Sequence, residues 1–216
     1  MPKITEVIPQ KKNPHRFNIF LDGAFAFGAD EDLVVEHRLV LGKLLDTSDV
    51  EKLLFESEEG KLMEKMYNLF SIRQRTEQEI KDYFRIKNYQ LKIKDQEQIS
   101  DLVIESLIEK LKQKGMINDL EFAKAWVESR KKKKGSRVLK QELFQKGISK
   151  EVIDGILDQE LSKDQQQTAE KLLEKKMRFW KNLDSMRLRK KAYEFLLRRG
   201  FEYDIVHEVV EKIIKK

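Results

Sequence analysis

The sequence predicts a mainly α-helical protein, with three tandem three-helix repeats in an elongated array preceded by a small N-terminal β-hairpin region. Three observations lead to this prediction. Beyond Gly60 apolar residues recur at spacings of three and four, no proline follows Pro14, and a helix-ending pattern occurs three times. Since an interior proline costs a helix about 3 kcal/mol, its absence over the rest of the chain favours helices.

The first part of the chain predicts β-strands. An alternating run covers Arg16–Leu21, the dipeptide Asp22-Gly23 follows, and an aromatic run covers Ala24–Phe27. A type I′ turn needs positive φ at both central residues, so Asp-Gly between two such runs indicates a hairpin. Ile4–Ile8 is expected to add a third strand.

Short helices are expected after the hairpin, over 30–37 and 48–56, where Ser48 and Glu51 have capping-box spacing. The N-cap spacing recurs further along the chain at Thr76 with Glu79, Asn118 with Glu121, and Ser162 with Gln165. Helices are expected to stop at Gly115, Gly147 and Gly200, because glycine adopts the left-handed C′ conformation at little cost.

The helix-ending pattern covers 80–89, 139–148 and 192–201. In each segment two apolar residues four apart are followed by Lys or Arg, then Asn or Gly, then a large apolar residue. We expect each to end a helix at a left-handed residue, which is Asn88 in the first segment. Amphipathic helices are expected around them at 61–71, 98–114, 119–132, 150–160, 164–180 and 203–215.

These segments predict four regions: a hairpin region over 1–60 and three-helix repeats over 61–117, 118–161 and 162–216. Repeats of this size have little core of their own and are expected to stack on their neighbours. The alternative is that any two amphipathic helices resemble each other, without a true repeat.

Charge is uneven along the chain, whose net charge is +6. Residues 1–60 hold 7 Lys and Arg against 12 Asp and Glu, whereas residues 162–216 hold 15 against 9. An acidic head and a basic tail indicate docking on a long, negative partner, such as nucleic acid or a filament that holds it. The alternative is a highly charged helical protein without such a partner.

Composition excludes several classes of protein. The chain has no cysteine, which excludes disulfides, thiolate metal sites and a cysteine nucleophile. No apolar run is long enough to span a membrane, so we expect a soluble, cytoplasmic protein without membrane contact. His15, His37 and His207 have no metal-ligand spacing, and no phosphate loop or nucleophile elbow occurs. We therefore expect no enzyme activity, cofactor or metal.

Two basic clusters are candidate binding sites for DNA phosphates or an acidic protein surface, since like charges this close repel unless a polyanion relieves them. The first consists of Arg130, Lys131, Lys132, Lys133, Lys134 and Arg137. The second consists of Arg187, Lys190, Lys191, Arg198 and Arg199. The alternative for both is a solvated, charge-rich helix end. The aromatic residues mostly have helical spacing and predict core packing, with one ring of Phe179-Trp180 exposed.

Two strings resemble the RecX family of bacterial recombinase regulators. The first runs through Lys114–Trp126 and continues at Glu142–Ile148, with the features Gly-x-Ile-x-Asp, Phe-Ala-x-x-Trp and Glu-Leu-x-x-Lys-Gly-Ile. The second is Arg73–Ile80, which is similar to Arg-x-Arg-Ser/Thr-x-x-Glu-Leu with Ile80 in place of Leu. The hairpin over 16–23 is similar to an N-terminal extension of long-form members from Gram-positive bacteria.

The resemblance implies a non-catalytic regulator of the RecA recombinase, most simply an inhibitor. Such a protein lies in the groove of the RecA–DNA filament and affects filament growth, ATP hydrolysis and strand exchange, in DNA repair, recombination and the SOS response. The partners implied are the RecA filament and single-stranded DNA, contacted directly or through the filament, and we expect a monomer. Two alternatives stay open: a DNA-binding protein with helix-turn-helix-like units, and a helical scaffold for another protein.

Overall fold

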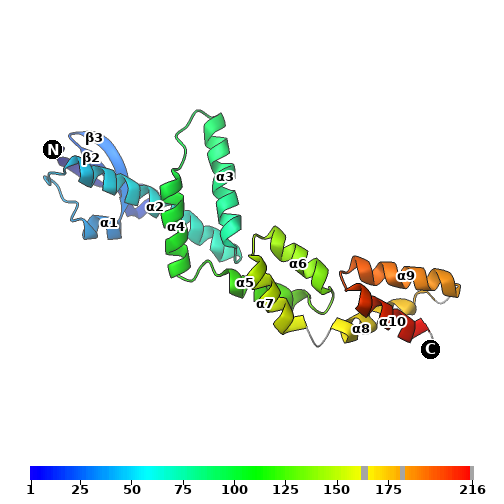
Figure 1. Cartoon of the computed structure of the whole chain (residues 1–216). Helices are drawn as coiled ribbons and strands as arrows, with labels where there is room; N and C mark the ends of the chain where they lie inside the picture. The colour runs from blue at the N-terminus through cyan, green and yellow to red at the C-terminus, as the bar shows by residue number, and fades with distance from the viewer. Residues whose placement is uncertain (162–164, 181–182, 215–216) are drawn as a thin grey trace. The chain divides into compact units, whose positions relative to one another are not determined.

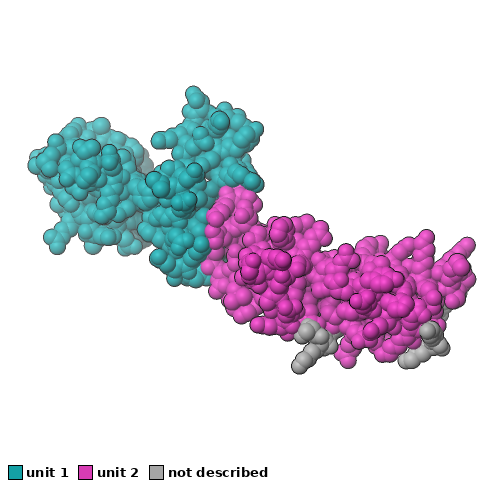
Figure 2. Space-filling model, in the orientation of Figure 1, with its two compact units in different colours: residues 1–74, 83–116 teal, residues 75–82, 117–216 magenta. Residues whose placement is uncertain are grey.

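The computed structural model describes residues 1–161, 165–180 and 183–214. Over these residues the chain forms three strands followed by ten helices (Figure 1). It divides into two compact units, which are residues 1–74 with 83–116 and residues 75–82 with 117–216 (Figure 2). The predicted fold class, mainly helical with a small N-terminal sheet, is confirmed.

The N-terminal sheet is antiparallel with the order β1-β2-β3, where β1 is Ile4–Gln10, β2 is Asn13–Leu21 and β3 is Ala24–Asp30. The predicted hairpin is confirmed, because Asp22 and Gly23 both have positive φ, at 48° and 83°. The predicted third strand is β1, which pairs with β2.

One face of this sheet carries the first core. A register shift between Ile19 and Phe20 in the pairing of β2 with β3 accounts for the imperfect alternation in the sequence. Ile19 and Phe27 from the sheet are buried with Leu33 of α1 (Glu31–Glu36) and with apolar residues of the next helix.

That next helix, α2 (Thr47–Ile72), is continuous, although the sequence predicted two helices over 48–56 and 61–71. Gly60 lies inside it. A Cβ at Gly60 would lie 2.9 Å from Asp30 Oδ2, so the missing side chain leaves room for the residue that caps α1. A glycine costs a helix interior only about 1 kcal/mol, and the close approach of Asp30 explains its presence here.

The start of α2 also differs from the prediction. The N-cap is Asp46, whose carboxylate accepts the backbone N–H of Asp49 at 2.7 Å, while the Asp49 carboxylate accepts the N–H of Asp46 at 3.4 Å. The capping box therefore lies two residues before the pair Ser48 and Glu51.

Two more helices follow, α3 (Glu77–Ile93) and α4 (Asp101–Gln113). The predicted end of a helix at Asn88 is wrong, because α3 continues to Ile93. The Asn88 side-chain amide donates to the Ile99 carbonyl at 2.8 Å and accepts the Ile99 backbone N–H at 2.9 Å. Asn88 is therefore held by a tertiary contact and does not form a left-handed cap. Tyr89, expected to fold back onto the helix, is 66% exposed.

The remaining helices form two sets of three. They are α5 (Asp119–Arg130), α6 (Ser136–Gln145) and α7 (Lys150–Leu161), followed by α8 (Gln165–Met177), α9 (Ser185–Arg198) and α10 (Tyr203–Ile214). Each set has its own buried apolar cluster, the first around Leu139 and Leu143 and the second around Phe195 and Phe201. The predicted N-cap at Ser162 lies outside the described residues.

Candidate nucleic-acid interface

Helices α6 and α9 end as the sequence predicted. Gly147 and Gly200 have positive φ, at 77° and 86°, and the next residues, Ile148 and Phe201, are buried. Each helix therefore closes with a left-handed glycine and an apolar residue that folds back onto the core. Both glycine ends also make a second contact, with the start of another helix.

The end of α9 caps the start of α6. The backbone N–H of Gly135 donates to the Arg199 carbonyl at 2.8 Å, and the N–H of Arg137 donates to the Gly200 carbonyl at 3.0 Å. Gly135 has no side chain to cap α6, so these carbonyls satisfy donors that would otherwise be unpaired. The approach is close: a Cβ at Gly200 would lie 2.5 Å from the Val138 nitrogen. Repeats two and three are thus joined through their middle helices.

The end of α6 meets the start of α3 in the same manner. The Thr76 hydroxyl, fully buried, donates to the Lys146 carbonyl at 2.7 Å and accepts the backbone N–H of Glu79 at 3.2 Å. The Lys146 ammonium lies 2.6 Å from the Glu79 carboxylate. A Cβ at Gly147 would lie 2.2 Å from Gln78 Cβ. The negative end of one helix dipole therefore faces the positive end of the next.

The predicted caps of α3 and α5 are confirmed. The Asn118 side chain accepts the backbone N–H of Glu121 at 3.0 Å. The carboxylate of the neighbouring Asp119 accepts the backbone N–H of Glu77 at 3.0 Å, a contact that the sequence did not predict because the two residues are 42 positions apart. The two strings that carry the family resemblance are thus in contact at the start of α3.

Much of the first basic cluster is neutralised within the chain. The Arg130 guanidinium lies 3.5 Å from the centre of the Trp126 ring and its Nε lies 3.6 Å from the Glu142 carboxylate. Glu142 also accepts the Trp126 indole N–H at 3.0 Å and pairs with Lys134. These side chains hold α5 to α6, so Arg130 and Lys134 have a structural role.

Lys131 is neutralised as well. Its ammonium lies 2.5 Å from Glu128 and 2.9 Å from Glu160. The hydrogen bond to Glu128, followed by the one to Glu160, raises the pKa of Lys131 above its usual range. The charge of Lys131 is therefore balanced locally.

The other three members of the first cluster are exposed. Lys132, Lys133 and Arg137 have no side-chain partner within the described part of the chain. They lie in the α5–α6 turn and the first turn of α6. These cations are available to a partner.

The second cluster divides in the same way. Arg199 donates to the Lys133 carbonyl at 2.8 Å and lies over the Phe195 ring at 4.7 Å, so it belongs to the junction between repeats. Arg187 lies 3.3 Å from Asp184, with both side chains exposed. The remaining members are Lys190, Lys191 and Arg198. All three are exposed, and none forms an ion pair with a residue that the structure describes.

An exposed aromatic ring beside the first cluster was missed. Phe144 is 71% exposed on α6, next to a small cleft of about 310 Å³ that Arg137, Lys140 and Lys150 also line. Lys140 lies 2.5 Å from Asp154. In the sequence Phe144 directly follows Leu143, which belongs to the buried apolar stripe of α6. This position beside the stripe was the sequence signal that the Phe144 ring is exposed.

The aromatic residues otherwise follow the prediction. Phe122, Phe195 and Phe201 are buried, and in the Phe179-Trp180 pair the first ring is 78% exposed while the second packs against a core. Among the described residues no cluster of His, Asp and Glu side chains could hold a metal ion. Every described helix is too short or too polar to cross a membrane.

Family models match three regions of the chain. They are described as the regulatory protein RecX N-terminal domain, over residues 2–46, and the second and third three-helix domains of RecX, over residues 118–157 and 163–210. The two three-helix matches correspond to the helix sets α5–α7 and α8–α10.

Relatives match over nearly the full length. Regulatory protein RecX of Bacillus subtilis (strain 168) is 35% identical over 215 residues, which is 99% of this chain and 78% of that protein. That of Clostridium perfringens (strain SM101) is 28% identical over 99% of this chain and 97% of that protein. A crystal structure of regulatory protein RecX has a TM-score of 0.73 and 27% identity, covering 98% of this chain and 100% of that one. The chain therefore belongs to the RecX family of regulatory proteins.

Proposed function

We propose that this chain is a non-catalytic regulator of the RecA recombinase in the cytoplasm, acting in DNA repair, recombination and the SOS response. It binds as a monomer along the groove of the RecA–DNA filament and inhibits filament growth, ATP hydrolysis and strand exchange. The proposal rests on a set of exposed cations in two adjacent repeats that form no side-chain ion pair with any residue the structure describes: Lys132, Lys133, Arg137, Lys190, Lys191 and Arg198.

Two features of the repeats support lateral binding to a polymer. Each repeat contributes only a few charges, so a single contact is weak and sensitive to salt. The capped junction between α6 and α9 joins the two sets, so that binding of one raises the effective concentration of the other. Together they allow firm binding to a repeating surface without a large apolar interface.

Helix-turn-helix reading of duplex DNA is the weaker alternative. In such a unit the last helix enters the major groove and approaches phosphates. Here α7 carries four carboxylates against one lysine, and α10 carries three against one. Carboxylates there would repel the DNA backbone, which favours a filament surface over bare duplex.

Direct contact with single-stranded DNA is a second candidate, which the exposed Phe144 ring favours. An aromatic ring beside Arg137 and Lys150 can stack on a base while the cations contact phosphates.

Phe144→Ala is then expected to weaken binding of the free chain to a thymidine 20-mer about tenfold, which corresponds to the loss of one stacked base. Fluorescence anisotropy measures this, with Phe179→Ala as the control, since the Phe179 ring is 78% exposed and lies outside this cleft. Equal binding by Phe144→Ala and the unaltered chain would exclude this contact.

Charge reversal tests the filament site. The variant K132E/K133E is expected to bind RecA filaments on single-stranded DNA about tenfold more weakly at moderate salt, and with a shallower salt dependence, because two anion contacts are lost. Co-sedimentation with filaments over a salt series measures both effects. The matched control K92E/K94E changes the net charge equally at two exposed lysines near the end of α3. If the two variants bind alike, Lys132 and Lys133 are not part of the site.

A further inference from the structure

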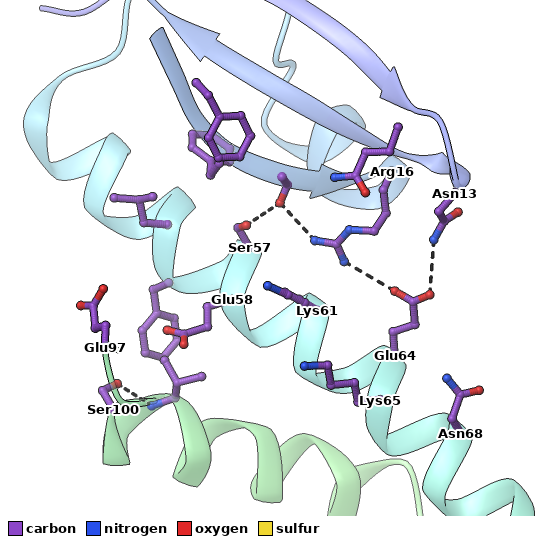
Figure 3. Close-up of a pocket in the computed structure, with 17 residues that line it drawn as sticks. Asn13, Arg16, Ser57, Glu58, Lys61, Glu64, Lys65, Asn68, Glu97 and Ser100 are labelled. Carbon is purple, nitrogen blue, oxygen red and sulfur yellow. Dashed lines mark hydrogen bonds and ion pairs between the residues drawn. The ribbon is translucent and has the colours of Figure 1, made fainter. Parts of the chain in front are cut away.

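The N-terminal unit holds a cleft of about 970 Å³ that the proposed function does not use. One wall is the sheet, the second is α2, and the third is the segment from Glu97 to Val103 at the start of α4 (Figure 3). All of its lining residues belong to the same compact unit.

Hydrogen bonds and an ion pair join the sheet to α2 along the cleft. The Gly28 carbonyl accepts from the Ser57 hydroxyl and from the Arg16 guanidinium, the latter at 3.2 Å. Arg16 is almost fully buried, and its Nη1 lies 3.8 Å from the Glu64 carboxylate, which also accepts a hydrogen bond from the Asn13 side-chain amide at 3.3 Å. These residues satisfy one another, so the wall they form is preformed.

Two lysines facing the cleft lack such partners. Lys61 and Lys65 lie one turn apart on α2 and project on the same side of the helix (Figure 3). No ion pair involving either occurs in the residues that the structure describes. Partial burial, together with the charges of Lys61 and Lys87, lowers the pKa of Lys65. An acidic group placed between Lys61 and Lys65 would relieve this repulsion.

The other features of the cleft favour a peptide over a nucleic acid. Phe25 and Leu54 are 59% and 43% exposed on its walls and offer an apolar contact. Glu58 and Glu97 line the end near α4, and burial followed by the Glu97 charge raises the pKa of Glu58. A nucleic-acid backbone would bring further negative charge to this end, whereas a peptide can present one carboxylate to the lysines and apolar side chains to the rest.

We propose that this cleft is a docking site for a short segment of a partner protein in which an acidic side chain stands close to an apolar one. The carboxylate lies between Lys61 and Lys65, and the apolar side chain packs on Phe25 and Leu54. The site is independent of the proposed filament contact, because its residues and the cations of the repeats belong to different compact units.

Selection of peptides on the full chain tests the proposal. A phage-displayed library of random 12-residue peptides is selected on immobilised protein, and the enriched peptides are labelled and measured by fluorescence anisotropy. We expect the enriched peptides to share Asp or Glu within a few residues of a large apolar residue. Their affinity is expected to fall about tenfold in K61E/K65E, because the charge complementarity with the acidic side chain is lost. It is also expected to fall in Phe25→Ala, because the apolar side chain of the peptide loses part of its contact.

The controls distinguish the possible outcomes. K92E/K94E has the same charge change outside the cleft and is expected to bind as the unaltered chain does. Circular dichroism shows whether each variant is folded. The proposal is overturned if no acidic–apolar pattern is enriched, or if K61E/K65E binds the peptides unchanged. It is also overturned if a thymidine 12-mer displaces them at equal concentration, since the cleft would then be a nucleic-acid site.

Discussion

Gly200→Ala is expected to destabilise the unit that contains repeats two and three by about 3 kcal/mol, which lowers its melting temperature by roughly 10 °C. Two costs add. A left-handed conformation, here φ 86°, costs a residue with a side chain about 1–2 kcal/mol, and overpacking costs about 1–3 kcal/mol. The overpacking arises because the new Cβ would lie 2.5 Å from the Val138 nitrogen. Thermal unfolding followed by circular dichroism measures the change.

Two further glycines separate these costs. Gly135 has a φ of −85°, and a Cβ there would lie 2.3 Å from the Gly200 carbonyl oxygen, so Gly135→Ala tests the close approach alone. Gly155, inside α7, faces open space, and Gly155→Ala is expected to raise stability by about 0.5–1 kcal/mol. If Gly200→Ala and Gly135→Ala unfold no earlier than the unaltered chain, the two repeats are not joined by this junction.

Thr76→Val is expected to lower the free energy of unfolding by about 2–3 kcal/mol. The variant keeps the shape of the buried side chain but removes a hydroxyl that makes two hydrogen bonds. Loss of the N-cap costs about 1 kcal/mol, and the Lys146 carbonyl left without its donor costs about 1–3 kcal/mol. Urea unfolding monitored by circular dichroism measures the effect.

Thr76→Ser is the matched control for this prediction. It keeps the hydroxyl and loses only a methyl group, so we expect a loss of about 1 kcal/mol or less. Equal stability of the Val and Ser variants would contradict the hydrogen bond between Thr76 and Lys146. It would also contradict the contact between the start of α3 and the end of α6.

The sequence predicted the features that depend on neighbouring residues. The Asp22-Gly23 turn and the Asn118 cap each depend on a few adjacent positions, and the structure confirms them. The glycine ends at Gly147 and Gly200 were predicted for the same reason. Their second role, the close approach to another helix, was not predictable, because it depends on residues more than 60 positions away.

The wrong predictions also arise from contacts between residues that are distant in the sequence. Asn88 has the local pattern of a helix end, but its side chain is bound to Ile99 and the helix continues. Lys131 and Lys134 belong to the strongest run of positive charge, yet Glu160 and Glu142 from other helices neutralise them. Local charge density therefore overestimated the available site, and only tertiary structure separates the paired cations from the exposed ones. The proposed limits of the repeats at 61, 118 and 162 remain predictions, and α2 crosses the first of them.

The most direct test of the account is the ATPase activity of RecA on single-stranded DNA during titration with this chain. Lateral binding along the filament predicts that activity falls at far less than one molecule of the chain per RecA, and that K132E/K133E needs a much higher concentration for the same effect. An ATPase rate that stays constant up to equimolar protein would contradict the account.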